Sequence, residues 1–346
     1  MTIDKKSAAA LGVIGVGFKL CYALIIDTPR LTGAFALTHL AGALGFLPAL
    51  LSLGLLERQY PGAEPEELLA RAGGRAGRGA YYVLLSLFLL VSATLSAAEL
   101  IDVATYIALS GQSKNWLNVA TVAAVCACAL CGCRAVAGAS RVRVLLLPLL
   151  LLLIVAVQYH SFVPRWLLPL LADGPKVIGR EAVALAGVNM LLVPIWMLCG
   201  SWRTAACTYG KVTLFTLTVA LFYGMLAPTM PFAQHTRFFR LDTLLSNGRT
   251  SLSLQLPHMI VVYTGLLTGA CFCLSMSARL LGRCFPRVKE QRFVLAGAAC
   301  VLGLLYTPVA AQENAWLIRA VSYPAQLAPL WALTISGAVR RRAARA

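Results

Sequence analysis

The chain has 346 residues, of which 59% are apolar and 12% are charged, and its mean hydropathy is +0.78. This composition excludes a soluble globular protein, because soluble domains carry about 25% charged residues. The net charge of +17 does not indicate nucleic-acid binding, since the basic residues are scattered among short loops and no aromatic stripe interleaves with them. We therefore predict an all-α integral membrane protein.

Ten apolar runs approach or exceed the roughly 20 residues that a helix needs to cross a bilayer. In chain order, the predicted spans are Ala8–Ile26, Thr32–Leu56, Ala80–Leu109, Leu117–Cys133, Val142–Gln158, Val183–Gly200, Val212–Met230, His258–Ala278, Val294–Ala310 and Val321–Val339. We expect the first span to be retained, because no small-residue cleavage site is evident after Met1–Ser7 and more spans follow. Residues 1–346 are thus predicted to form one polytopic domain.

The orientation of the spans follows from the loops. Most of the 30 Lys and Arg residues lie in loops on the side that also holds both termini. Cytoplasmic loops are enriched in these residues, so both termini are predicted to be cytoplasmic. The C-terminal RRRAARA sequence is expected to lie on the anionic inner leaflet.

The first span contains an unusual stretch, Leu11–Lys19, with Gly12, Gly15, Gly17 and a full positive charge at Lys19. Glycine weakens a helix interior, and an ionisable group in hydrocarbon costs at least about 2.5 kcal/mol. Transporters place their solute sites at broken helices, where freed backbone groups face a cavity. We predict that this helix is broken and that Gly15 and Gly17 expose backbone groups to a solute.

Ten spans divide into two halves of five, approximately 8–158 and 183–339. An odd number of spans per half forces opposite orientations, as an inverted repeat requires. The sixth span should then match the first, and Gly187, Asn189 and Pro194 interrupt it. The predicted site lies between these two broken spans, where the Asn189 amide offers a donor and an acceptor. The alternative is that the glycines allow close helix packing and the proline only kinks its helix.

The third span carries a polar stripe at helical spacing, formed by Ser92, Ser96, Glu99, Asp102 and Tyr106. We interpret Glu99 as a charge that faces the site, whereas Asp102 is close enough to the outer end to be hydrated. Lys19 lies roughly 16 Å into its own helix and is the candidate partner of Glu99. Such a pair either sets the charge preference of the site or holds two helices in register.

No metal, cofactor or catalytic site is predicted. Cys126, Cys128, Cys131 and Cys133 lie in one apolar run without a shared face, so we interpret them as small buried residues. The four histidines are scattered and no catalytic motif is present, which argues against an enzyme. The segment Pro231–Pro257 reads as a short amphipathic helix that either caps the outer vestibule or packs on loops.

Two stretches resemble a known family. The cytoplasmic sequence ERQYPGAEPEELLARAGGRAGR and the basic, leucine-rich ASRVRVLLLPLLLL are similar to the corresponding parts of the B subunit of spore germinant receptors, the spore germination permease family. The counterparts of the loop motif are Arg58, Tyr60, Pro61, Gly62, Glu67, Leu68 and Leu69. Glu99 matches an acidic residue that the family carries late in its third span.

The resemblance implies the five-plus-five inverted fold of the amino acid-polyamine-organocation transporter superfamily. It also implies a spore inner-membrane subunit that recognises an amino acid or another small nutrient, together with a membrane-anchored A-type subunit and a lipoprotein C-type subunit. Lys19 and the Cys-rich fourth span depart from the family, and Lys19 suits a carboxylate better than an amine. The alternative function is a secondary amino acid transporter that works without partners.

Overall fold

The computed structural model describes residues 3–25, 34–107, 113–158, 164, 173–226 and 255–343, and this part of the chain is helical without a strand. Its elements are α1 (Lys5–Leu11), the π-helix η1 (Gly12–Gly17), α2 (Phe18–Ile25), α3 (Phe35–Gln59), α4 (Pro65–Ile107), α5 (Lys114–Leu130), α6 (Gly132–Gln158), α7 (Pro175–Asn189), α8 (Leu192–Cys199), α9 (Trp202–Leu226), α11 (Gln255–Cys284), α12 (Glu290–Leu304), the 3₁₀ helix η6 (Pro308–Ala310) and α13 (Gln312–Ala343).

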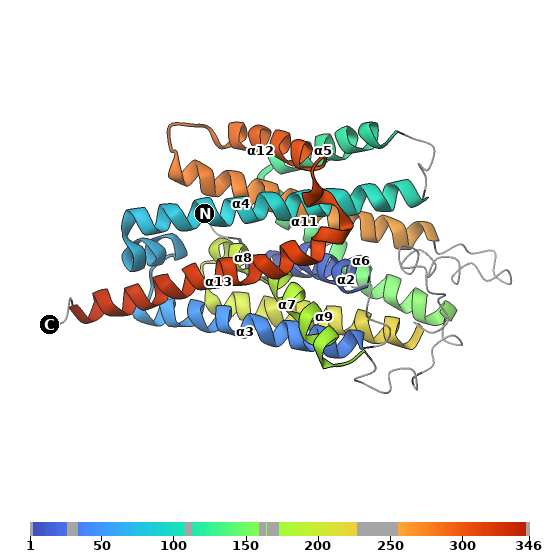
Figure 1. Ribbon diagram of the computed structural model, residues 1–346, viewed down its shortest axis with the longest axis horizontal. Helices are drawn as coiled ribbons and strands as arrows, with labels where there is room; N and C mark the ends of the chain where they lie inside the picture. Colours follow the sequence, from blue (N-terminus) through green and yellow to red (C-terminus); the bar gives the residue numbers. More distant parts are fainter. Residues whose placement is uncertain are drawn as a thin grey trace.

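Most helices run along the long axis of the molecule (Figure 1). The α1–η1–α2 helix is in the interior, where it contacts α6, α9 and α11. Around it, α4 packs along α11, and α3 packs against α7, α9 and α13. The link between α3 and α4 and the end of α13 lie at the same end of the bundle (Figure 1).

The prediction of an all-helical, multi-span membrane protein is confirmed. Six helical stretches of the described chain are long and apolar enough to cross a membrane, and the bent pair α5–α6 raises the number to seven if it counts as one span. Exposed leucines such as Leu44 and Leu145, which are 64% and 75% exposed, suit contact with lipid tails. The predicted number of ten spans stays a prediction; α12, for example, has only 15 residues.

The long α4 consists of two parts. At Gly74 the backbone has φ 73° and ψ −179°, which separates a short helix, 65–73, from the long helix that follows. Glycine tolerates this left-handed φ without steric cost. The short helix packs on α13, where the Ser336 hydroxyl donates to the carbonyl of Ala72 at 2.9 Å.

The cysteine-rich run is not one helix. The prediction of a span Leu117–Cys133 is corrected by a bend of 102° between α5 and α6. Gly132 has φ 82°, a left-handed conformation that ends α5 and redirects the chain. Cys126 and Cys128 therefore lie before the bend and Cys133 after it. Among the described residues, no group of three or more His, Cys, Asp or Glu side chains could hold a metal ion.

The last helix, α13, contains two prolines, Pro324 and Pro329. One face of its first turns is buried in the protein, where Ala315 and Arg319 are each 4% exposed. Its last turns pack on the α3–α4 link, where the Tyr60 hydroxyl donates to the carbonyl of Gly337 at 3.1 Å. One helix thus connects the interior to one end of the bundle.

Several predictions stay untested. These are the internal inverted repeat, the cytoplasmic location of both termini, and the single-domain boundary. The predicted amphipathic segment lies, apart from its last three residues, outside the described part of the chain, as do His160 and His235.

Candidate functional site: a buried polar cluster on α2, α4 and α13

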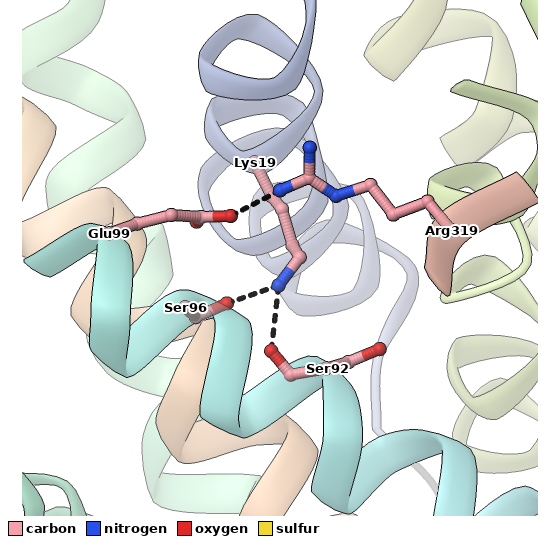
Figure 2. Close-up of polar contacts among 5 residues, drawn as sticks. All are labelled: Lys19, Ser92, Ser96, Glu99 and Arg319. Atoms are coloured by element: carbon pink, nitrogen blue, oxygen red, sulfur yellow. Dashed lines mark hydrogen bonds and ion pairs between the residues drawn. The ribbon is translucent and has the colours of Figure 1, made fainter. Parts of the chain in front are cut away.

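Lys19 is on α2, and it is 2% exposed. Its ammonium group donates to the backbone carbonyl of Ser92 at 2.7 Å and to the hydroxyl of Ser96 at 2.5 Å (Figure 2). Both acceptors are on α4, one turn apart. A buried ammonium needs such oxygen acceptors, because an unsatisfied charge in a low-dielectric interior is very costly.

Glu99 is on the next turn of α4 and forms an ion pair with Arg319 of α13. The carboxylate Oε1 and the guanidinium Nη2 are 2.5 Å apart, and the two side chains are 5% and 4% exposed (Figure 2). Removing one partner of such a pair leaves a buried charge uncompensated, which costs about 3–5 kcal/mol. The pair therefore joins α4 and α13 inside the bundle.

Arg319 falls between the last two predicted spans and was therefore predicted to lie in an outer loop. The structure corrects this prediction. The structure begins α13 at Gln312, so Arg319 lies within the helix and is buried. The described chain thus buries two basic side chains, Lys19 and Arg319. The polar residues at the start of α13 had lowered the hydropathy of this stretch, so the span was predicted to begin too late.

Three members of the polar stripe predicted on the third span share one buried environment. Ser92, Ser96 and Glu99 are buried and all three contact a cation from another helix. The contacts of Lys19 and Glu99 thus lie on consecutive turns of α4, which brings the two predicted site charges into one cluster. A direct Lys19–Glu99 pair stays a prediction.

Asp102 belongs to a different environment. It lines a pocket of about 310 Å³ together with Lys114 and Asn118 of α5, and it is partly exposed. The location of Asp102 at the outer, hydrated end of its helix stays a prediction.

The predicted break in the first span takes a different form. Gly12–Gly17 is a π-helix, and the residues on either side, Leu11 and Phe18, keep helical dihedrals. The expectation that the chain unwinds here is therefore corrected. A π-helical turn interrupts the α-helix while its backbone groups can still bond within the helix, as a membrane interior requires.

Gly15 and Gly17 face other helices closely. A Cβ atom on Gly15 would lie 3.6 Å from the Cα of Gly269 in α11, and one on Gly17 would lie 2.8 Å from the Phe215 ring of α9. Close packing, the alternative held open from the sequence, accounts for Gly17, whereas a Cβ atom on Gly15 would make an ordinary contact. Solute contact through their backbone stays a prediction.

The break predicted in the sixth span takes the form of a short turn. α7 ends at Asn189 and α8 begins at Leu192, while Met190 and Leu191 between them keep helical dihedrals. Across the break the bonding changes to the shorter i→i−3 pattern, because Leu191 N–H donates to Val188 and Val193 N–H donates to Met190, both at 3.0 Å. Pro194 has no N–H and cannot donate to Met190, which explains the change.

Asn189 lies at this turn, and the residue is 1% exposed. Neither its Oδ1 nor its Nδ2 has a hydrogen-bond partner among the residues that the structure describes. Leaving a buried polar group unpaired costs about 1–3 kcal/mol, so such a group usually has a function or a ligand. This amide is the strongest sign of a solute site in the described chain.

Gly187, two residues earlier, has a packing role. A Cβ atom at this position would collide with the carbonyl oxygen of Arg319. The absence of a side chain therefore lets α13 cross α7 in direct backbone contact. Gly187 thereby positions the helix that carries Arg319, and it also places Arg319 close in space to the break that holds Asn189.

Comparisons with known proteins give a fold but no family. No protein-family model matches the sequence, and no curated protein matches it. The structure is similar to that of a nucleobase-cation-symport-1 family transporter, solved in a closed conformation with bromovinylhydantoin bound. The TM-score is 0.62 at 15% identity, and the match covers 91% of this chain and 75% of the transporter chain.

The chain has the fold of a multi-span membrane transporter. At this low identity the likeness establishes the fold alone, and the resemblance to the spore germination permease family is neither supported nor contradicted by it. The cluster of Lys19, Glu99 and Arg319 is therefore assigned from the geometry of this chain itself.

Proposed function

We propose that this protein binds a small polar solute in the manner of a secondary transporter, between the α7–α8 break and the polar cluster of α2, α4 and α13. The observation that carries this proposal is the buried Asn189 amide, whose donor and acceptor have no partner in the described chain. A solute with both a donor and an acceptor would satisfy them. The transporter fold supports a site at a helix break.

The charges of the cluster support an anionic group on the solute. Lys19 and Arg319 bring two basic side chains to the cluster. Basic side chains favour a carboxylate, as in an amino acid or a related small carboxylic acid. Solute binding then shifts the balance between conformations by no more than its difference in affinity for them.

The proposed site is tested with the purified protein in lipid nanodiscs. Amino acids, small carboxylic acids and amines are added, and ligand-induced stabilisation is measured by thermal unfolding. Asn189→Ala should lower the apparent affinity for the active carboxylate about tenfold or more while the yield of folded protein stays normal.

The matched control is Asn118→Ala. It removes another buried amide with an unpartnered oxygen, but this amide lines the pocket beside Asp102 and Lys114. This control should bind the solute as the wild type does. Equal loss of affinity in both variants, or stabilisation by amines alone, would contradict the proposal.

A second candidate, that the protein is a germinant-recognition subunit, is favoured by the loop motif around Tyr60. This loop is ordered against α13, where the side-chain amide of Gln59 donates to the Thr334 carbonyl at 3.0 Å. A rearrangement of α13 on nutrient binding would alter a surface that A-type and lipoprotein C-type partners could contact. The site would be the same, and only its use would differ.

Reconstitution separates the two functions. A stand-alone transporter accumulates labelled amino acid in proteoliposomes that contain this chain alone. A receptor subunit shows no accumulation but co-purifies with A-type and lipoprotein subunits encoded by neighbouring genes. Accumulation without partners would rule out the receptor as the sole function.

A further inference from the structure

A groove of about 750 Å³ lies between α1, α6 and α9, away from the polar cluster. Its wall includes apolar side chains from η1 and α6, and three basic side chains also line it. The residues that matter here are Val13, Val142 and Leu145 on the wall, and Lys6, Arg141 and Lys211 among the bases.

The three bases lie where apolar sequence begins. Lys6 is followed by the buried part of α1, Arg141 by Val142 and the leucine run of α6, and Lys211 by the apolar half of α9. In a membrane, such positions correspond to the boundary between headgroups and hydrocarbon. The groove therefore has a charged level and an apolar level.

The apolar level is open to the membrane. Val142 is 67% exposed and Leu145 is 75% exposed, so both present their side chains outward. The neighbouring Arg143 points instead toward α11, where it donates to the hydroxyl of Thr268. Of the two arginines in this turn of α6, Arg141 is thus the one that faces the groove.

One acidic group also lies near the charged level. Asp4 is 3.6 Å from Arg141, and both side chains are about half exposed. Hydrogen bonding with Ser7 lowers the pKa of Asp4, so its carboxylate is ionised at neutral pH. Counting this carboxylate, the three bases still leave a positive surplus in the groove.

We propose that this groove is a binding site for an anionic phospholipid, with its phosphate among Lys6, Arg141 and Lys211 and an acyl chain along Val13, Val142 and Leu145. Basic pockets between membrane helices on the cytoplasmic side recognise such headgroups. A free phosphate would leave the apolar wall unused, and a zwitterionic lipid would leave the positive surplus uncompensated. The lipid would join the first helix to α6 and α9.

The test measures lipid retention by native mass spectrometry of the full chain, purified with equal amounts of phosphatidylglycerol and phosphatidylcholine. The wild type should retain phosphatidylglycerol preferentially. The variant Lys6→Gln/Lys211→Gln should lose about fivefold in apparent affinity for each base removed, since one Lys or Arg near an anionic surface contributes about 1 kcal/mol. Thermal unfolding checks that the variant is folded.

The charge control is Arg287→Gln/Lys289→Gln, which removes two exposed bases between α11 and α12. It should retain phosphatidylglycerol as the wild type does. Equal loss in both double variants, or equal retention of the two lipids by the wild type, would overturn the proposal.

A steric variant tests the apolar wall independently of charge. Gly138 lines the groove, and a Cβ atom there would meet no atom within 4 Å, so Gly138→Leu fills the groove without disturbing the fold. It should reduce phosphatidylglycerol retention, whereas Gly303→Leu, at an equally open position of α12, should not. Unchanged retention in Gly138→Leu would show that no acyl chain occupies the groove and would overturn the proposal.

Discussion

The carbonyl oxygen of Arg319 lies against Gly187 so closely that no Cβ atom fits between the two backbones. This contact places the helix that bears the buried guanidinium directly beside the helix that breaks at Asn189. The packing glycine of α7 and the buried carboxylate of α4 thus both hold α13 at Arg319. The four predictions below test this arrangement and the contacts around it.

Gly187→Ala should destabilise the protein. The added methyl group collides with rigid backbone, and overpacking of this kind costs about 1–3 kcal/mol. Unfolding is measured thermally in detergent. The control is Gly179→Ala on the same helix, where the added atom meets nothing within 4 Å and stability should rise slightly. Equal effects of the two substitutions would contradict the packing role.

Arg319→Met should destabilise the protein by about 3–5 kcal/mol, because it leaves Glu99 charged and buried. Glu99→Gln/Arg319→Met should recover part of this loss, since the double variant holds no uncompensated carboxylate. The exposed Glu67–Arg71 pair provides the control, and Arg71→Met should cost at most about 1 kcal/mol. Strict additivity of the two core substitutions would disprove the coupling.

Ser96→Ala should cost more stability than Ser92→Ala. Lys19 bonds to the side chain of Ser96 but to the backbone of Ser92, so only the first substitution removes an acceptor. A hydrogen bond to a charged group contributes about 1.5–3 kcal/mol. Chemical denaturation of the two variants in parallel measures the difference. Equal stability would mean that Lys19 does not depend on the Ser96 hydroxyl.

Glu57→Leu should loosen the junction of α8 and α9. The Glu57 carboxylate accepts from the indole N–H of Trp196 at 2.9 Å and from the backbone N–H of Trp202. We expect a loss of about 2 kcal/mol or more, because both donors lose a charged acceptor. Glu57→Gln keeps an acceptor oxygen and should retain most of the stability. Limited proteolysis at the α8–α9 junction gives a second readout, and equal digestion of both variants would contradict this role.

The sequence predicted the membrane class and part of the site for clear physical reasons. Hydropathy identifies helices that must bury their backbone groups, and a charge in such a helix is rare enough to be noticed. Lys19 and Glu99 were found in this way, and Asn189 was found because the sixth span was expected to match the first. The break near Pro194 was predicted because proline removes a backbone donor.

Other features depend on tertiary packing and were missed. Arg319 was placed in a loop, although Arg319, Ser322 and Gln326 form a polar stripe at helical spacing that could have identified it. The glycines of η1 indicated a discontinuity, but a π-helix and an unwound segment have the same local sequence preferences. The bend at Gly132 was hidden in a continuous apolar run.

The two prolines of α13 separate its interior end from the end that packs on the α3–α4 link. Each proline deprives one upstream carbonyl of its usual donor, so bending costs least between Arg319 and Gly337. The N-terminal half of the helix can therefore tilt with its guanidinium while the C-terminal half keeps its hydrogen bond from Tyr60. A hinge at this place would confine movement to the half near the polar cluster and leave the opposite end as a fixed pivot.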